Sequence, residues 1–240
     1  MPKTLYHNIE KIYYGSKNMQ RIIEAELMDD KLQAEAYAAA NFEQAHNLVI
    51  AAFDRVFPHV KLQEPILDLG CGPGNISFRF ADHFPNCKLI AIDGSAEMIR
   101  LANKHKDQKP GLYNQINFIE GILPAAEIPK GPYSAIVSNS LLHHLHQPEV
   151  LWNTINQYAS SGTKIFIMDL FRPLKKEQAQ KIVNKYSADE PEILKQDFYN
   201  SLLAAFSIKE IEQQLIDARL SELQIDIISD RHILIFGEKH

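Results

Sequence analysis

The sequence is poor in the features that characterise secreted and membrane proteins. It contains 2 cysteines in 240 residues, Cys71 and Cys87, too few for the disulfide framework of a small secreted domain. No apolar stretch approaches the ~20 residues that a membrane-spanning helix needs. Residues 1–6 lack the apolar core of a secretory signal. These absences predict a cytoplasmic protein with no membrane partner.

An excess of positive charge is also missing. The chain has 25 Lys and Arg against 30 Asp and Glu, a formal net charge of −5, which argues against broad binding to phosphate backbones. Its one basic cluster, residues 104–109, has no interleaved aromatic residues for base stacking and is interpreted as a solvated loop. Nucleic acid is therefore not expected as a partner. The hydrophobic fraction of 45% and the length instead fit one soluble domain with a substantial core.

Three of the 10 glycines lie close together in the segment ILDLGCGPG at residues 66–74. The apolar run before Gly70 predicts a buried parallel strand, and glycines at alternate positions let the backbone turn and approach a ligand closely. Apolar residues at helical spacing follow from Asn75 to Phe84. A strand, a glycine turn and a helix N-terminus together predict a nucleotide-type site.

The spacing of these glycines departs from the dinucleotide fingerprint Gly-x-Gly-x-x-Gly. The third slot of that fingerprint holds Asn75, and the last glycine falls one residue early, at Gly74. A second apolar run, residues 88–92, ends in Asp93, where an acidic side chain can accept hydrogen bonds from both ribose hydroxyls. The two pieces fit one strand–helix–strand unit.

Three motifs together resemble class I S-adenosylmethionine-dependent methyltransferases: ILDLGCGPG (66–74), AIDGSAEMI (91–99) and YSAIVSNSLLHHL (133–145). The resemblance covers residues 37–240 in order and implies S-adenosyl-L-methionine as cofactor. The residues that it implies for cofactor binding are Asp68, Gly70, Gly72, Gly74, Asp93, Gly94, Met98, Gly121, Ile122 and Asn139.

The resemblance also implies specific roles for most of these residues. The three glycines line the methionine moiety, Asp93 binds the ribose and Met98 packs on the adenine. Asp68 holds the ligand's ammonium group, and the backbone at Asn139 contacts the methionine end. The chain departs from many relatives at Ile122, where they carry an acidic residue facing the adenine amine.

Strands and helices alternate along the rest of the chain, which predicts a mostly parallel sheet covered on both faces. The last two apolar runs are separated only by Asp230 and Arg231 and should form an antiparallel hairpin. The resemblance implies a Rossmann-like, doubly wound seven-stranded sheet with six parallel strands and one antiparallel strand. Strands are expected at 65–69, 88–92, 116–119, 133–138, 164–169, 222–228 and 232–237, and helices at 75–84, 96–105, 148–158, 174–186, 191–204 and 208–218.

Two segments lie outside this core. Residues 1–58 are expected to form an N-terminal helical cap of the same domain, with a long helical run from Met19 to Phe57, and residues 59–240 the core. Residues 170–206 are expected to be a lid insertion. Ligands of open α/β sheets bind at the carboxyl ends of the strands, so both segments are predicted to cover that edge and form the acceptor pocket; ordinary packing is the alternative.

Histidines that follow the fourth predicted strand are the candidates for catalysis. A hydroxyl acceptor needs a base during methyl transfer, and imidazole titrates near neutrality. His144 is the preferred base and His143 the alternative; both can instead cap a turn. His146 is close by in the sequence, but no cysteine or carboxylate completes a ligand set nearby, so no metal is expected.

Substrate contacts are predicted from two places. Asp169 and Arg172, after the fifth strand, can grip a polar substrate or pair with each other. Tyr37 and Phe42 can line the pocket from the N-terminal cap.

Missing motifs narrow the reaction. The fourth strand exits as Ser138-Asn139-Ser140-Leu141, which lacks the Asn/Asp-Pro-Pro-aromatic signature of planar-amine methylation, the Pro-Cys pair of pyrimidine methylation and the aspartate of catechol-type enzymes. A small-molecule O-, N- or C-methyltransferase is therefore predicted. Two alternatives stay open: another group transfer from the same ligand, and a non-catalytic partner subunit. The expected partners are a small-molecule substrate and, as an open alternative, a second copy of the chain in a homodimer.

Overall fold

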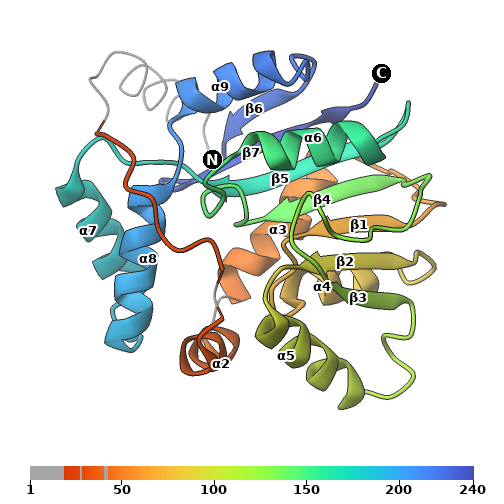
Figure 1. Cartoon of the computed structure of the whole chain (residues 1–240), viewed down its shortest axis with the longest axis horizontal. Helices are drawn as coiled ribbons and strands as arrows, with labels where there is room; N and C mark the ends of the chain where they lie inside the picture. Colours follow the sequence, from red (N-terminus) through yellow and green to blue (C-terminus); the bar gives the residue numbers. More distant parts are fainter. Residues whose placement is uncertain (1–18, 28, 41–42) are drawn as a thin grey trace.

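A seven-stranded sheet with strand order β3-β2-β1-β4-β5-β7-β6 forms the centre of the molecule (Figure 1). The computed structural model describes residues 19–27, 29–40 and 43–240. Strands β1 to β5 pair in parallel, and β7 is antiparallel to both β5 and β6. The sheet predicted from the sequence, six parallel strands and one antiparallel, is confirmed. The strands are β1 (Ile66–Leu69), β2 (Leu89–Asp93), β3 (Ile116–Glu120), β4 (Ala135–Asn139), β5 (Lys164–Leu170), β6 (Gln224–Ile227) and β7 (His232–Glu238).

Helices cover both faces of the sheet, which is why its central strands are apolar on both sides. Leu67 and Leu69 face a core that includes α6 and α9. Ile66 faces the opposite core, which includes α3 (Glu43–Val56), α4 and α5. The predicted helices are confirmed to within two residues: α4 (Asn75–His83), α5 (Ala96–Asp107), α6 (Glu149–Tyr158), α7 (Lys176–Tyr186), α8 (Glu192–Ala204) and α9 (Ile208–Asp217).

The basic cluster was predicted to be a loop, and this is wrong for its first four residues. Helix α5 continues to Asp107, so Lys104, His105 and Lys106 lie in its last turn. Positive charge there interacts favourably with the carbonyl end of the helix dipole.

The order in which the chain adds strands to the sheet reverses between β1 and β4. From β1 the chain passes through α4 to β2 on one side, whereas β4 pairs with β1 on the other side. Connections that leave two adjacent parallel strands in opposite directions open a crevice at their carboxyl ends. This crevice positions the site described below.

The N-terminal segment is only partly helical. Helices α2 (Lys31–Ala39) and α3 (Glu43–Val56) are present, but residues 19–27 contain no helix, so the predicted continuous helix from Met19 is wrong. Helix α2 begins only after Asp30, whose carboxylate accepts a hydrogen bond from the backbone N–H of Gln33. The preceding residues are held by tertiary contacts instead: the Ile22 N–H donates to the Leu203 carbonyl at 3.1 Å. We call residues 19–27 the strap.

Helix α3 belongs to the sheet core. The ring of Phe53 is fully buried and makes edge contacts with Phe80 and Phe166, with ring centroids 5.1 and 5.3 Å apart. Helices α7 and α8 pack mainly on each other in a separate apolar cluster. The strap runs past α8 to α2, on the side where the parallel strands end (Figure 1). No helix in these described ranges is long and apolar enough to span a membrane.

Candidate functional site

Two pockets meet at the carboxyl edge of the sheet. The first, the glycine-loop pocket, is lined by residues that include Asp68, Gly70, Gly72, Asp93, Met98 and Ile122. The second, the histidine pocket, is lined by residues that include His143, His144, Tyr186, Asp197, Phe198 and His232. Five residues line both pockets: Tyr37, His46, Asn139, Ser140 and His144. The two spaces therefore share a wall.

The glycines of the loop serve different purposes. Gly70, Gly72 and Gly74 all have a left-handed backbone, with φ of 73°, 52° and 84°, which favours glycine. A Cβ on Gly74 would lie 2.8 Å from the ring of Phe118, whereas a Cβ on Gly72 would meet no atom of the described residues within 4 Å. Gly74 is not among the pocket-lining residues. Gly72 therefore faces open space, and Gly74 permits close packing instead of the predicted ligand contact.

Asp93 connects the end of β2 to the glycine loop. Its carboxylate accepts hydrogen bonds from the backbone N–H groups of Gly72 and Ser95, at 2.7 and 2.9 Å. Burial raises the pKa of this carboxyl, and the two backbone hydrogen bonds oppose that shift. Met98 is 4% exposed and lines the same pocket. The loop, the carboxylate and Met98 thus come together as the sequence predicts.

Asp68 is a buried carboxyl at the wall of the glycine-loop pocket. The Ser77 hydroxyl donates to its Oδ2 at 2.5 Å. Burial raises the pKa of Asp68 to about 7, because a low-dielectric surrounding disfavours the charged form. The carboxyl is therefore able to change its protonation state near neutral pH.

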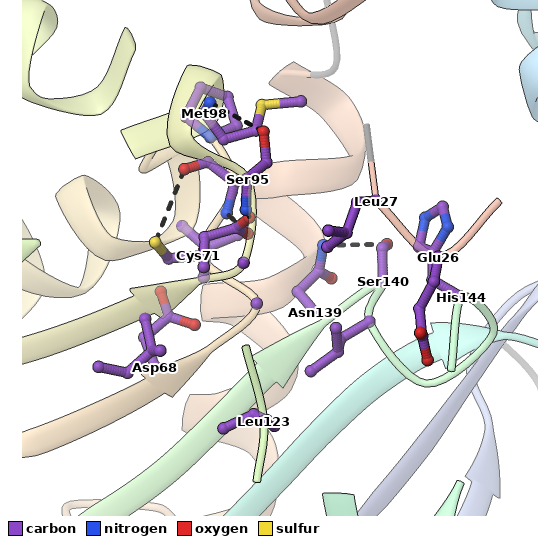
Figure 2. A pocket seen from close by; sticks show the side chains of 18 of the residues that line it. Glu26, Leu27, Asp68, Cys71, Ser95, Met98, Leu123, Asn139, Ser140 and His144 are labelled. Carbon is purple, nitrogen blue, oxygen red and sulfur yellow. Dashed lines mark hydrogen bonds between the residues drawn. The ribbon is translucent and has the colours of Figure 1, made fainter. Parts of the chain in front are cut away.

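The turn after β4 separates the two pockets. The Asn139 side-chain amide donates to the Ser140 hydroxyl at 3.1 Å, and both residues line both pockets. In Figure 2, Asp68 and Cys71 lie on one side of this pair and His144 lies on the other. Gly94, Gly121 and Ile122, also predicted from the sequence, line the glycine-loop pocket.

His143 is held by a buried carboxylate. Its Nδ1 lies 2.6 Å from Oδ1 of Asp169, which also accepts from the Leu170 backbone N–H, while Oδ2 accepts from that of Leu142. Burial by itself would lower the pKa of His143, but the charge of Asp169, its hydrogen bond to the ring and the charge of Glu24 together raise the pKa. The side chain lines only the histidine pocket.

His144 lies at the shared wall, as expected for a group near the reacting atoms. Burial, followed by the neighbouring charge of His143, lowers its pKa to about 3. Its imidazole is thus neutral but a weak base, and proton transfer is most efficient when the pKa of the base is near the working pH. This argues against His144 as a direct general base.

A carboxylate does complete the histidine cluster, contrary to the sequence-based expectation. Oε1 of Glu24 lies 3.2 Å from Nδ1 of His144 and 3.8 Å from Nε2 of His143. Glu24 is in the strap, about 120 residues away in the sequence, where no motif indicates a functional residue. Only the folded chain brings the three side chains together.

The strap is fixed across the site by Arg21. Its guanidinium donates to the carbonyls of His143 and Leu145 at 2.8 and 2.9 Å, and to that of Ala204. Further along the strap, Glu26 and Leu27 line the glycine-loop pocket (Figure 2). The strap therefore contributes to the walls of the site.

Of the four residues predicted to contact substrate, Asp169 and Arg172 do not line the two pockets, whereas Tyr37 does. Arg172 binds both carboxylate oxygens of Glu210 at 2.8 Å and donates to the Ala205 carbonyl, so it does not pair with Asp169. Neither Asp169 nor Arg172 lines either of the two pockets, because both are bound by protein groups. Tyr37 lines both pockets, and Phe42 lies outside the described residues.

Several lining residues were missed by the sequence analysis. His232 is the first residue of β7 and pairs with Leu170, the last residue of β5. An antiparallel strand begins at the edge where parallel strands end, so the predicted hairpin contained a usable signal for His232. His46 lies within α3, and nothing in its local pattern separates it from a packing residue.

Comparison with known proteins gives one family. The family model described as "Methyltransferase domain" matches residues 66–162. An uncharacterized methyltransferase of Mycobacterium tuberculosis is 26% identical over 108 residues, 45% of this chain and 51% of that protein. A mitochondrial ubiquinone biosynthesis O-methyltransferase of Schizosaccharomyces pombe is 25% identical over 109 residues, 45% of this chain and 39% of that protein. The chain spans about half the length or less of these curated relatives.

Solved structures share the fold over most of the chain. A methyltransferase from Aquifex aeolicus, described as dependent on S-adenosylmethionine, has a TM-score of 0.63 at 14% identity and covers 86% of this chain and 97% of its own. The plantazolicin methyltransferase BpumL, solved with S-adenosylhomocysteine, has a TM-score of 0.65 at 18% identity and covers 88% of this chain and 92% of its own.

Proposed function

Residues 66–162 form a class I S-adenosylmethionine-dependent methyltransferase domain, and from this premise we propose that the protein transfers the cofactor's methyl group to a small-molecule acceptor. The cofactor occupies the glycine-loop pocket, with its ribose at Asp93, its adenine at Met98 and its methionine end at Gly70, Gly72 and Asp68. The acceptor occupies the histidine pocket.

The shared wall supports this proposal most directly. Asn139, Ser140 and His144 line both pockets, so a methyl group at the methionine end of the first space faces the second. Methyl transfer from a sulfonium needs chiefly an in-line nucleophile held close with water excluded. Two adjoining pockets at a shared wall provide such a geometry.

The lining of the histidine pocket favours a polar acceptor with an apolar or aromatic part. Tyr186 and Phe198 offer aromatic surface, while Asp197 and Arg231 offer charge. We propose an oxygen nucleophile, in line with the O-methyltransferase among the relatives. The experiment is to incubate the protein with S-adenosylmethionine and a panel of phenols, carboxylic acids and amines, and to measure S-adenosylhomocysteine release. Release with none of the acceptor classes would contradict the proposal.

Adding a methyl group to Gly72 tests where the cofactor lies. We expect Gly72→Ala to weaken S-adenosylhomocysteine binding about 5- to 10-fold, because the new Cβ occupies open space that the ligand needs. Gly111→Ala is the matched control, since Gly111 also has a positive φ and an added Cβ there would meet nothing within 4 Å, but it lies outside both pockets. Calorimetric titration measures both. Equal affinities in the two variants would place the ligand elsewhere.

Cofactor binding should depend on pH through Asp68. The ionised carboxylate attracts the ligand's ammonium group, and burial places the pKa of Asp68 at about 7 in the free protein. Because this pKa is raised, the charged form is lost as the pH falls below 7, and affinity should drop about 10-fold from pH 8 to pH 6. Titration of S-adenosylhomocysteine at the two pH values measures this. Asp68→Asn should abolish the difference, and a pH-independent parent protein would exclude the role of Asp68.

A further inference from the structure

The strap and the turn after β4 bring three potential metal ligands to one point. Oε1 of Glu24, Nε2 of His143 and Nδ1 of His144 all lie within 4.8 Å of one another. We propose that these three atoms bind a divalent transition-metal ion beside the histidine pocket.

The distances fit a common metal ion. Ligand atoms about 2.1 Å from a tetrahedral zinc ion lie roughly 3.4 Å from each other. The carboxylate oxygen lies 3.2 Å from Nδ1 of His144 and 3.8 Å from Nε2 of His143. Both distances from the carboxylate oxygen are therefore within about 0.4 Å of the tetrahedral value, and the two nitrogens lie within 4.8 Å of each other.

His143 has its other ring nitrogen held by a carboxylate, as metal-binding histidines usually do. Nδ1 of His143 lies 2.6 Å from the Asp169 carboxylate and carries the proton that it donates, so Nε2 keeps a lone pair. His144 makes a backbone hydrogen bond with Ala25. Nδ1 of His144 has no hydrogen-bond partner among the described residues, so its lone pair is available to a metal ion. Both free lone pairs belong to the nitrogens near Glu24.

Two of the three ligand atoms are buried without a hydrogen bond. Oε1 of Glu24 and Nδ1 of His144 have no hydrogen-bond partner within the described part of the chain, although they are 3.2 Å apart. A buried polar atom without a partner is rare and costs stability. A cation between them would satisfy both at once, and its charge would offset that of the buried carboxylate.

The donor set indicates the class of metal. Two imidazole nitrogens and one carboxylate oxygen suit zinc and other first-row transition metals, whereas magnesium and calcium prefer oxygen ligands. Three protein ligands leave a fourth position open, the arrangement of catalytic sites. His143 and His144 both line the histidine pocket, so the open position is expected to face the acceptor.

The role of the ion rests on the proposed function. An acceptor hydroxyl that takes the fourth position becomes more acidic, as metal-bound water does. Its proton leaves to solvent, the O–CH3 bond forms as the S–CH3 bond breaks, and the sulfonium becomes the neutral thioether of S-adenosylhomocysteine. His144 then acts as a ligand to the ion instead of as a base.

Metal binding is tested on the full chain without a histidine tag. The protein is treated with chelator, dialysed and titrated with Co²⁺, whose visible absorption reports four- or five-coordinate nitrogen and oxygen ligation. We expect one Co²⁺ per chain, displaced by Zn²⁺. Glu24→Gln and His144→Ala should each lower the affinity at least about 10-fold. Gln20→Ala is the control, since Gln20 lies in the strap but is exposed and lines neither pocket.

Binding of S-adenosylhomocysteine is measured on the same samples. Retained binding by Glu24→Gln shows that the variant is folded and that the cofactor site is intact. A parent protein that binds S-adenosylhomocysteine but not Co²⁺, or a Glu24→Gln protein that binds Co²⁺ as well as Gln20→Ala does, would overturn the metal site alone. A parent protein that does not bind S-adenosylhomocysteine would instead contradict the proposed function.

Discussion

Replacing Asp93 with alanine is expected to weaken binding of S-adenosylmethionine and S-adenosylhomocysteine by about 10- to 100-fold. Loss of charge-assisted hydrogen bonds from an ionised acceptor typically costs ~1.5–3 kcal/mol. The carboxylate also holds the Gly72 N–H at 2.7 Å, so its removal loosens the loop that contacts the ligand. Calorimetric titration with each ligand measures the change.

Glu120→Ala is the matched control for this variant. Glu120 ends β3 and pairs in register with Asp93, but it is exposed and does not line the glycine-loop pocket. Its replacement should leave both affinities within about twofold of the parent. Equal losses in the two variants would show that Asp93 acts through the general charge of the sheet edge instead of direct contact.

Replacing His143 with alanine should lower turnover strongly and leave cofactor affinity nearly unchanged. Turnover is expected to fall by about 10²- to 10⁴-fold, the range for loss of a group that assists proton removal, because this ring is fixed by Asp169 beside the acceptor. Affinity for S-adenosylhomocysteine should change less than about threefold, since His143 does not line the glycine-loop pocket. Rates are measured with an acceptor from the panel at saturating cofactor.

His146→Ala separates this effect from a general disturbance of the turn. His146 lies outside both pockets, with Nε2 bonded to the Glu24 carbonyl at 2.8 Å. Its replacement alters the same loop and strap but removes no pocket-lining group. If His146→Ala loses as much turnover as His143→Ala, the histidines serve only to hold the turn, and the reaction proceeds by positioning alone.

Most of the cofactor side of the site was predictable because its signals are local. Gly70 to Gly74, Asp93 and Met98 belong to one strand–helix–strand–helix segment, in which each element fixes the position of the next. Apolar periodicity gave the strands and helices to within two residues. The failures, such as the helix expected from Met19, fall where tertiary hydrogen bonds replace the local ones that a helix would make.

The sequence by itself therefore determined the strands, the helices, the glycine turn and a nucleotide-type site, since these follow from short-range patterns of apolar residues and glycine. The resemblance to a known family added the seven-stranded order and the identity of the ligand. The tertiary structure decided the partners of the charged groups. Arg172 forms an ion pair with Glu210 instead of Asp169, and Asp169 forms a hydrogen bond with His143. Glu24 reached the histidines from the strap. Such pairings join residues with no fixed spacing, because a buried charge takes whichever opposite partner the packed elements place beside it.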